Sequence, residues 1–279
     1  MNWKIGAQRF LNLKKPLVMG VLNVTPDSFF DGGDFFDLEQ ATERALGMVS
    51  QGAGIIDIGG ESTRPMAPIV PVDVELQRVI PVIERLVKLV GVPLSIDTQK
   101  PDVARRAIEA GASIVNDVGA ASEDPAMLDV VAQSGCGYIC MHMQGNPRTM
   151  QTSPTYSDVV SDVDAFFTSK LRVYRACGID LEQVVLDVGI GFGKEVEHNL
   201  ELLRHLESYK KHGRPILLGV SRKSFIGKVL EINDASERGP ASLACVCWGL
   251  RAGVELFRVH DVSETSHVVR MWQAIESLS

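Results

Sequence analysis

The sequence predicts a single (β/α)8 barrel, on the strength of three observations. Short apolar runs alternate with amphipathic segments along the chain. The runs lack the inside–outside alternation of half-exposed strands, which is typical of parallel strands buried on both faces. The length of 279 residues suits one such barrel, usually about 250 residues. We therefore expect one domain over residues 1–279, with its active site at the carboxyl ends of the strands.

Eight apolar runs supply the expected strands, and each is followed by a polar cluster. A doubly wound open sheet is the alternative fold. It normally has fewer strands, and its G-x-G-x-x-G fingerprint does not follow the first run. The runs cover residues 17–22, 55–58, 94–96, 113–115, 138–141, 184–186, 216–220 and 254–259.

Amphipathic segments between the runs supply the expected helices. Residues 72–90 carry a wide apolar stripe, and Pro101 stands where a helix over 103–108 would begin. Two more stripes cover residues 159–173 and 268–275. The apolar segment 242–250 fits a subunit contact and a buried packing helix equally well.

Composition argues against several classes of protein. The net charge is −7, from 28 basic and 35 acidic residues, whereas nucleic-acid affinity depends on Lys and Arg. No apolar run approaches the roughly 20 residues that span a membrane. The five cysteines are odd in number and scattered, so we expect no disulfide framework and a reducing, cytoplasmic location.

Polar side chains follow the expected strands, where a barrel places its active site. One group joins two acids, an amide and a cation. Carboxylates accept paired hydrogen bonds and lysine donates them, so this group suits a planar heterocycle with several N–H groups and a carbonyl. Its members are Asp97, Asn116, Asp187 and Lys223, after the third, fourth, sixth and seventh runs.

A second group suits a phosphate or diphosphate. Asn23 follows the first run, Arg258 lies near the end of the eighth run, and His260 follows that run; these two runs become neighbours when the barrel closes. Arg64 follows the second run. Basic side chains beside an amide fit a phosphate. Asn23 also suits magnesium, which takes few protein ligands together with phosphate and water.

Other polar positions at the strand ends have different expected roles. Asp57 and Asp117 are expected to orient loops rather than contact a ligand. His142 fits a ligand contact and a structural role equally well. The glycines at 189, 191 and 193 are expected to let the chain approach a flat ligand closely.

Eight stretches of the chain, in their order and spacing, resemble bacterial dihydropteroate synthases along nearly the whole length. Any one stretch alone would be a weak signal, but the set is highly specific. The stretches are MGVLNVTPDSF at 19–29, IDIGGESTRP at 56–65, SIDT at 95–98, IVND at 114–117, MHMQG at 141–145, LDVGIGFGK at 186–194, GVSRKSF at 219–225 and RVHDV at 258–262.

The resemblance implies a pterin-binding barrel of folate biosynthesis, typically a homodimer. The reaction joins 6-hydroxymethyl-7,8-dihydropterin diphosphate to 4-aminobenzoate, needs Mg²⁺ and releases pyrophosphate; sulfonamides compete at the aminobenzoate site. The motifs carry over four sets of residues: Asp97, Asn116, Asp187 and Lys223 for the pterin; Asn23, Arg64, Arg258 and His260 for the diphosphate, with Asn23 also at the metal; Phe29, Thr63, Pro65 and Ser224 for the aminobenzoate; and Asp31, Lys223, Arg258 and His260 for catalysis.

Residues 25–33 and 62–67 resemble two mobile loops of that family. Met66 stands where the family usually has Gly, which is expected to alter loop closure or sulfonamide affinity because a side chain restricts the backbone. We expect a dissociative substitution, with Asp31 stabilising the cation left after pyrophosphate departs.

Two alternative functions stay open on the sequence. A pterin-binding methyltransferase barrel shares the Asp97, Asn116 and Asp187 pattern, but would not need Arg258 and His260. A non-catalytic barrel would tolerate the loss of polar strand ends, and none is missing here.

Overall fold

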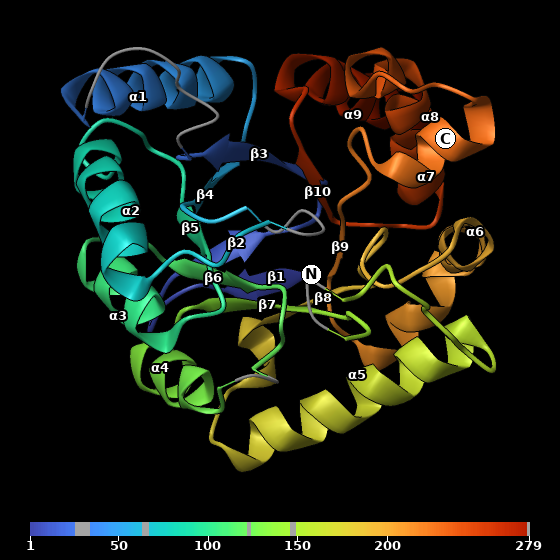
Figure 1. Cartoon of the computed structure of the whole chain (residues 1–279), viewed down its shortest axis with the longest axis horizontal. Coiled ribbons are helices and arrows are strands. Elements are labelled where there is room, and N and C mark those ends of the chain that lie inside the picture. The colour runs from blue at the N-terminus through green and yellow to red at the C-terminus, as the bar shows by residue number, and fades with distance from the viewer. Residues whose placement is uncertain (26–33, 63–66, 122–123, 146–148, 278–279) are drawn as a thin grey trace.

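Parallel strands close into a barrel surrounded by helices (Figure 1). The structure is a computed structural model that describes residues 1–25, 34–62, 67–121, 124–145 and 149–277, with 34–37 described by their backbone alone. The barrel order is β10-β3-β4-β5-β6-β7-β8-β9, which confirms the predicted fold. The strands are β3 (Leu17–Asn23), β4 (Ile55–Gly59), β5 (Leu94–Asp97), β6 (Ile114–Asp117), β7 (Gly137–Met141), β8 (Val184–Asp187), β9 (Ile216–Leu218) and β10 (Leu256–Val259).

Helices connect the strands and cover the outside of the barrel (Figure 1). Two α-helices separate β9 from β10, and the second of them contains the predicted segment 242–250. None of the helices in the described ranges has the length and apolar character needed to cross a membrane. The α-helices are α1 (Asp34–Ser50), α2 (Val72–Leu86), α3 (Pro101–Glu109), α4 (Ala126–Ser134), α5 (Val159–Ala176), α6 (Val196–Arg204), α7 (Ser224–Leu230), α8 (Gly239–Arg251) and α9 (Val262–Glu276), and the short 3-10 turns are η2 (Leu181–Gln183), η3 (Leu206–His212) and η4 (Ala235–Arg238).

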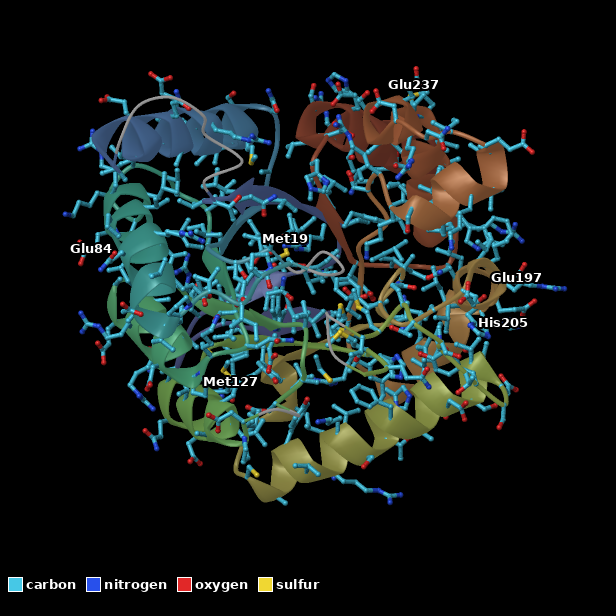
Figure 2. The ribbon with its side chains drawn as sticks, in the orientation of Figure 1. Met19, Glu84, Met127, Glu197, His205 and Glu237 are labelled. Atoms are coloured by element: carbon cyan, nitrogen blue, oxygen red, sulfur yellow. The ribbon has the colours of Figure 1, made fainter. Side chains whose placement is uncertain are left out.

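The large core lies between the barrel and its helices. Apolar side chains of α2 and α5, such as Ile83 and Phe167, are fully buried against the strands. Burying each such side chain contributes about 1.5–3 kcal/mol relative to leaving it in water. Met19 and Met127 lie inside the molecule, whereas the side chain of Glu84 points outward from α2 (Figure 2).

A short hairpin, which the sequence analysis did not predict, packs at the amino ends of the strands. It pairs β1 (Asn2–Lys4) with β2 (Phe10–Asn12). The Trp3 side chain is fully buried, and its indole N–H donates to the Gln183 carbonyl at 2.7 Å. Trp3 belongs to a second apolar cluster, formed with one inward residue from most of the strands: Met19, Ile55, Ile114, Ile139, Val185, Leu217 and Leu256.

Strand register aligns polar groups at the opposite end of the barrel. Asn23 pairs with Gly59, Gly59 with Asp97, and Asp97 with Asn116, on four neighbouring strands. Asp187 pairs with Met141 on the far side. The predicted strands stopped just before these residues; in the structure Asn23, Asp97, Asn116 and Asp187 belong to the strands themselves. Sheet hydrogen bonds therefore fix their backbone positions.

Candidate active site

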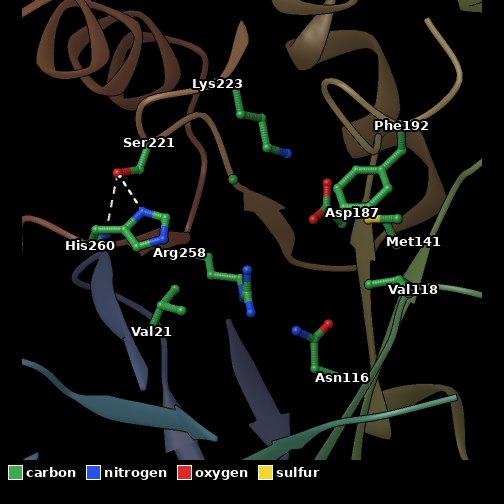
Figure 3. Close-up of a pocket in the computed structure, with 11 residues that line it drawn as sticks. Val21, Asn116, Val118, Met141, Asp187, Phe192, Ser221, Lys223, Arg258 and His260 are labelled. Carbon is green, nitrogen blue, oxygen red and sulfur yellow. Dashed lines mark hydrogen bonds between the residues drawn. The ribbon is translucent and has the colours of Figure 1, made fainter. Parts of the chain in front are cut away.

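A pocket opens at the carboxyl ends of the barrel strands (Figure 3). It holds about 390 Å³ of empty space, part of which is open to solvent. Polar and apolar side chains from six strand ends share its wall. The lining residues are Val21, Asn116, Val118, Met141, Asp187, Phe192, Gly219, Ser221, Lys223, Arg258 and His260.

Arg258 joins the buried acids of this mouth. Its Nε donates to Asp57 Oδ2 at 2.7 Å, and a terminal nitrogen donates to Asp97 Oδ2 at 2.6 Å. Asn116 Nδ2 donates to the same Asp57 oxygen at 3.0 Å. Burial disfavours the charge of Arg258, but Asp57 and Asp97 more than compensate and raise its pKa. The guanidinium predicted to face a diphosphate thus lies against Asp97, which was predicted to bind the pterin, and against Asp57.

Asp97 keeps one buried acceptor unpaired. Its Oδ1 is buried and accepts no hydrogen bond from any residue that the structure describes. Burial raises the pKa of this carboxyl to about 7, against the opposing effect of Arg258 and with a further increase from Asp57. A buried acceptor without a donor is costly, so this oxygen suits a ligand that brings an N–H group.

Lys223 and Asp187 face each other across the pocket. Burial lowers the pKa of Lys223 to about 8, partly offset by Asp187. Burial raises the pKa of Asp187, and Lys223 opposes the rise. The Lys223 ammonium donates to the Ile190 carbonyl and lies 4.7 Å from the centre of the Phe192 ring. The two groups form a polar pair beside an aromatic face, which suits a flat polar ring.

Two glycines of the segment 189–193 pack closely against the neighbouring chain. A Cβ on Gly189 would collide with the His142 carbonyl oxygen, and one on Gly193 would lie 2.6 Å from the Gln144 carbonyl oxygen. Both glycines have positive φ, of 68° and 62°. The close approach of Gly189 and Gly193 is thus to the segment 142–144, whereas a Cβ on Gly191 would lie 3.1 Å from a side-chain carbon of Lys223, which lines the pocket.

Lys194 holds this glycine segment from within. Its ammonium donates to the carbonyls of Gly189 and Phe192, both at 2.9 Å, and lies 3.0 Å from His142 Nδ1. Burial lowers the pKa of Lys194 well below its usual range. Burial, then Lys194, lowers the pKa of His142 to about 3. His142 is thus a neutral structural partner of Lys194, which is one of the two roles that the sequence left open.

The expected loop-orienting role holds for Asp117 but is wrong for Asp57. Asp117 accepts from the backbone N–H groups of Gly119 at 2.8 Å and Ala121 at 2.7 Å. Asp57 instead binds two side chains of the mouth, Arg258 and Asn116. The difference arises because the Asp57 side chain lies inside the barrel, where a long side chain from β10 reaches it.

Asn23 ends β3 and His260 directly follows the neighbouring strand β10, at the predicted diphosphate side. Asn23 is partly exposed, and its amide oxygen is the kind of ligand that Mg²⁺ prefers. Among the described residues no three His, Cys, Asp or Glu side chains gather as a metal cage. The donor set thus fits an ion held mainly by a phosphate ligand and water. Burial, then Arg258 and Arg222, lowers the pKa of His260 to about 4, so its ring is neutral near pH 7.

Several predicted residues fall outside the ranges that the structure describes. They are Phe29, Asp31, Thr63, Arg64 and Pro65, together with Met66. Ser224 is described: it begins α7, directly after Lys223, and its side chain is exposed.

Six pocket residues had no site role assigned from the sequence: Val21, Val118, Met141, Phe192, Gly219 and Ser221. Phe192 had a usable signal, since a large aromatic side chain between glycines has little room to be buried in its own turn. Ser221 and Met141 had only their places at strand exits.

The chain matches the family model described as pterin binding enzyme over residues 19–260. It is 46% identical to the dihydropteroate synthase of Escherichia coli, over 95% of this chain and 93% of that one. The dihydropteroate synthase of Yersinia pestis, solved with a sulfonamide drug, matches with a TM-score of 0.93 at 42% identity, over 99% and 100% of the two chains.

The chain belongs to the dihydropteroate synthase family. The Xanthomonas albilineans synthase is a further match. Its structure with 4-aminobenzoic acid has a TM-score of 0.92 at 42% identity, over 99% of both chains. Its structure with 7,8-dihydropteroate has a TM-score of 0.89 at 40% identity and also covers 99% of both chains. Membership in the dihydropteroate synthase family agrees with the motif resemblance seen in the sequence.

Proposed function

We propose that this protein condenses 6-hydroxymethyl-7,8-dihydropterin diphosphate with 4-aminobenzoate, giving 7,8-dihydropteroate and pyrophosphate. Family membership supports this reaction, and one observation at the site carries it. Asn116, Asp187, Lys223 and His260 line the pocket, and the unpaired Oδ1 of Asp97 belongs to the strand residue that pairs with Asn116; Asn23 lies at the end of β3. Acceptors for ring N–H groups therefore lie next to polar groups suited to a diphosphate.

The proposed pterin site uses complementary hydrogen bonding. A pterin carries an amino-pyrimidine edge, whose N–H groups match the carboxylates of Asp97 and Asp187. Asn116 can donate and accept, and Lys223 donates to ring oxygen or nitrogen. Arg258 contacts Asp97 in this structure, at 2.6 Å. A pterin donor that takes over Asp97 would free one side of the guanidinium, which is the change needed for Arg258 to contact the diphosphate.

The proposed diphosphate site lies at the β3 and β10 ends. Asn23 would supply one oxygen to Mg²⁺, and the bound ion would neutralise charge on the departing pyrophosphate. Arg258 and His260 would donate hydrogen bonds to the same group, as would Arg64. Donors that are fixed before the reaction stabilise developing charge without reorganising during it.

The proposed chemistry is a dissociative substitution at the pterin methylene carbon. The C–O bond to the diphosphate breaks, and its electron pair leaves with pyrophosphate. The electron-rich pterin ring shares the positive charge left on the methylene carbon, with Asp31 as the proposed stabilising carboxylate. The amine nitrogen of 4-aminobenzoate then forms the new C–N bond and loses one proton.

The aminobenzoate site would adjoin the pterin at the outer edge of the mouth. Ser224, at the start of α7, would donate to the carboxylate, and Phe29, Thr63 and Pro65 would complete the site. A sulfonamide has the same length and a matching amine, so we propose that sulfonamides compete here. Phe192 lies beside Lys223 and would offer its ring face to either aromatic group.

A pyrophosphate-release assay tests the function. With pterin diphosphate, 4-aminobenzoate and Mg²⁺ present, we expect release that stops when any one is omitted. Asp187→Asn should reduce turnover sharply. Asp180→Asn, which alters a partly exposed ion pair with Lys4 far from the pocket, should not. Absence of release from the complete mixture, or methyl transfer to a corrinoid instead, would contradict the proposal.

We further propose a homodimer formed through helices of the C-terminal half, with α6 and α8, but not α9, at the contact. On α8, Val246 and Leu250 face inward, while the Trp248 side chain is 43% exposed. Leu200 on α6 is 45% exposed. The Trp248 indole N–H donates to the carbonyl of Leu203, which also lies on α6. In sedimentation experiments Trp248→Arg should yield monomers, whereas Met271→Arg on α9 should not; a monomeric wild type would exclude the dimer.

The proposed location is the cytoplasm. Its reducing conditions keep thiols free, and all five cysteines of the chain are without a disulfide.

A further inference from the structure

Ser221 and His260 lie on adjacent loops of the pocket wall, after β9 and β10. A second pair stands directly beside them. Arg222 Nε donates to Asp261 Oδ2 at 2.9 Å, and a terminal nitrogen of Arg222 donates to Asp261 Oδ1. Arg222 adopts a positive φ of 57°, a conformation that a non-glycine residue rarely takes. Two consecutive residues of one loop therefore hold two consecutive residues of the next.

The Ser221 hydroxyl contacts two nitrogen atoms of His260. Its Oγ lies 3.2 Å from the backbone nitrogen and 3.1 Å from ring Nδ1 (Figure 3). Ser221 is buried, with 8% of its surface exposed. In the figure the other ring nitrogen, Nε2, lies on the side of the ring away from Ser221.

The number of hydrogens available for these two contacts selects one tautomer of the His260 ring. The backbone N–H can only donate, so Oγ must accept from it. The hydroxyl then has one hydrogen left, and Nδ1 is the acceptor within reach. The other tautomer would have Oγ accept twice. The Ser221 hydroxyl hydrogen and the His260 Nε2 lone pair would then both lack a partner among the residues that the structure describes. The burial that keeps His260 neutral makes the choice of tautomer matter.

We propose that Ser221 is a positioning residue that fixes His260 in the tautomer protonated at Nε2, so that this N–H faces the pocket as a donor to the diphosphate. The inference rests on the proposed function for the identity of the anion. Its physical consequence is general. A neutral imidazole attracts an anionic oxygen through N–H and repels it through its lone pair, so the tautomer decides whether His260 helps or hinders binding.

Nitrogen-15 spectra of the histidine-labelled protein test the tautomer directly. His260→Gln identifies the signals of that ring by their loss. In the wild type at pH 7 we expect a pyridine-type Nδ1 and a pyrrole-type Nε2. Ser221→Ala should produce a mixture of the two tautomers, and Ser221→Thr, which keeps a hydroxyl, should restore the wild-type pattern. Unchanged spectra in Ser221→Ala would overturn the proposal.

Ser242→Ala is the matched control. Ser242 Oγ accepts from the Arg222 backbone N–H at 2.9 Å, so its loss loosens the same loop without touching the histidine. We expect the wild-type tautomer in this variant. An equal disturbance of the ring signals would show that loop rigidity, rather than the Ser221 hydroxyl, sets the tautomer, and would also overturn the proposal.

Kinetics link the tautomer to the anion. Ser221→Ala should lower kcat/KM for the pterin diphosphate about ten-fold, as loss of a hydrogen bond to a charged group typically does. Calorimetric affinity for the pterin alcohol, which lacks the diphosphate, should stay within about two-fold. If Ser221→Ala lowered kcat/KM for the diphosphate and affinity for the alcohol by the same factor, the anion-directed role of Ser221 would be refuted. If wild type releases no pyrophosphate, the proposed function fails, while the spectra still decide the tautomer.

Discussion

Replacing Asp57 with Asn should shift the pH dependence of pterin binding to lower pH. Asp57 raises the pKa of Asp97 by repulsion and shares the guanidinium of Arg258 with it. Asp57→Asn removes the repulsion and leaves Arg258 with one full carboxylate partner. Both effects stabilise ionised Asp97, so its pKa should fall from about 7.

The size of the effect follows from the ionised fraction. With a pKa of about 7, only about one Asp97 carboxyl in ten is ionised at pH 6. If the pterin N–H groups require the carboxylate and the Lys223 ammonium, wild-type affinity should rise about six-fold from pH 6 to its maximum at about pH 7.5. The descending limb belongs to Lys223, which loses its proton at about pH 8. In Asp57→Asn the ascending limb should move down while the descending limb stays.

Isothermal titration with the pterin alcohol from pH 5 to 9 measures both limbs, after correction for the titration of the ligand itself. Glu75→Gln is the matched control, because Glu75 also raises the pKa of Asp97 but touches neither Arg258 nor Asn116. We expect a smaller downward shift there. A flat wild-type profile below pH 7, or an upward shift in Asp57→Asn, would refute the reasoning.

Three further predictions concern other residues of the mouth. Lys223→Ala should weaken binding of both substrates by about ten-fold or more, since a charged hydrogen-bond donor is lost; unchanged pterin affinity by calorimetry would contradict its assignment. Asp31→Asn should reduce turnover, and wild-type kcat would remove Asp31 from the mechanism. The folded state disfavours protonated His142, whose pKa is lowered from 6.5 to about 3. The stability that neutral His142 contributes to the folded state is fully present above about pH 6.5 and is lost as the pH falls towards 3. At pH 5 the free energy of unfolding should be lower by about 2 kcal/mol for this reason. His142→Gln should flatten that part of the denaturation profile, and an unaltered slope from pH 7 to 5 would count against it.

The barrel was predictable because its signal is local and repeated. Parallel strands buried on both faces leave short apolar runs, and the polar residue after each run marks the mouth. Asn116, Asp187 and Lys223 could therefore be predicted to share one pocket without knowledge of any distance between them, and in the structure they do.

The partner of Arg258 was not predictable in the same way. Its contact with Asp57 joins residues 201 positions apart, and the choice among several acids depends on side-chain length and direction. The position of a residue at the end of a strand indicates which part of the mouth it occupies, but not which residue it contacts. The hairpin was missed for a different reason, since strands of three residues carry too little periodicity to detect.

Trp3 gives the protein an optical probe of the barrel end that lies away from the chemistry. Its indole is fully buried, whereas Trp248 is 43% exposed and Trp272 is only partly buried. Gly137 leaves room for the ring, because a Cβ there would lie 2.9 Å from a Trp3 ring carbon. A collisional quencher in water would therefore quench the fluorescence of Trp248 first, and that of Trp3 only when that end of the barrel opens. Fluorescence could thus separate loosening of that end from ligand effects at the mouth.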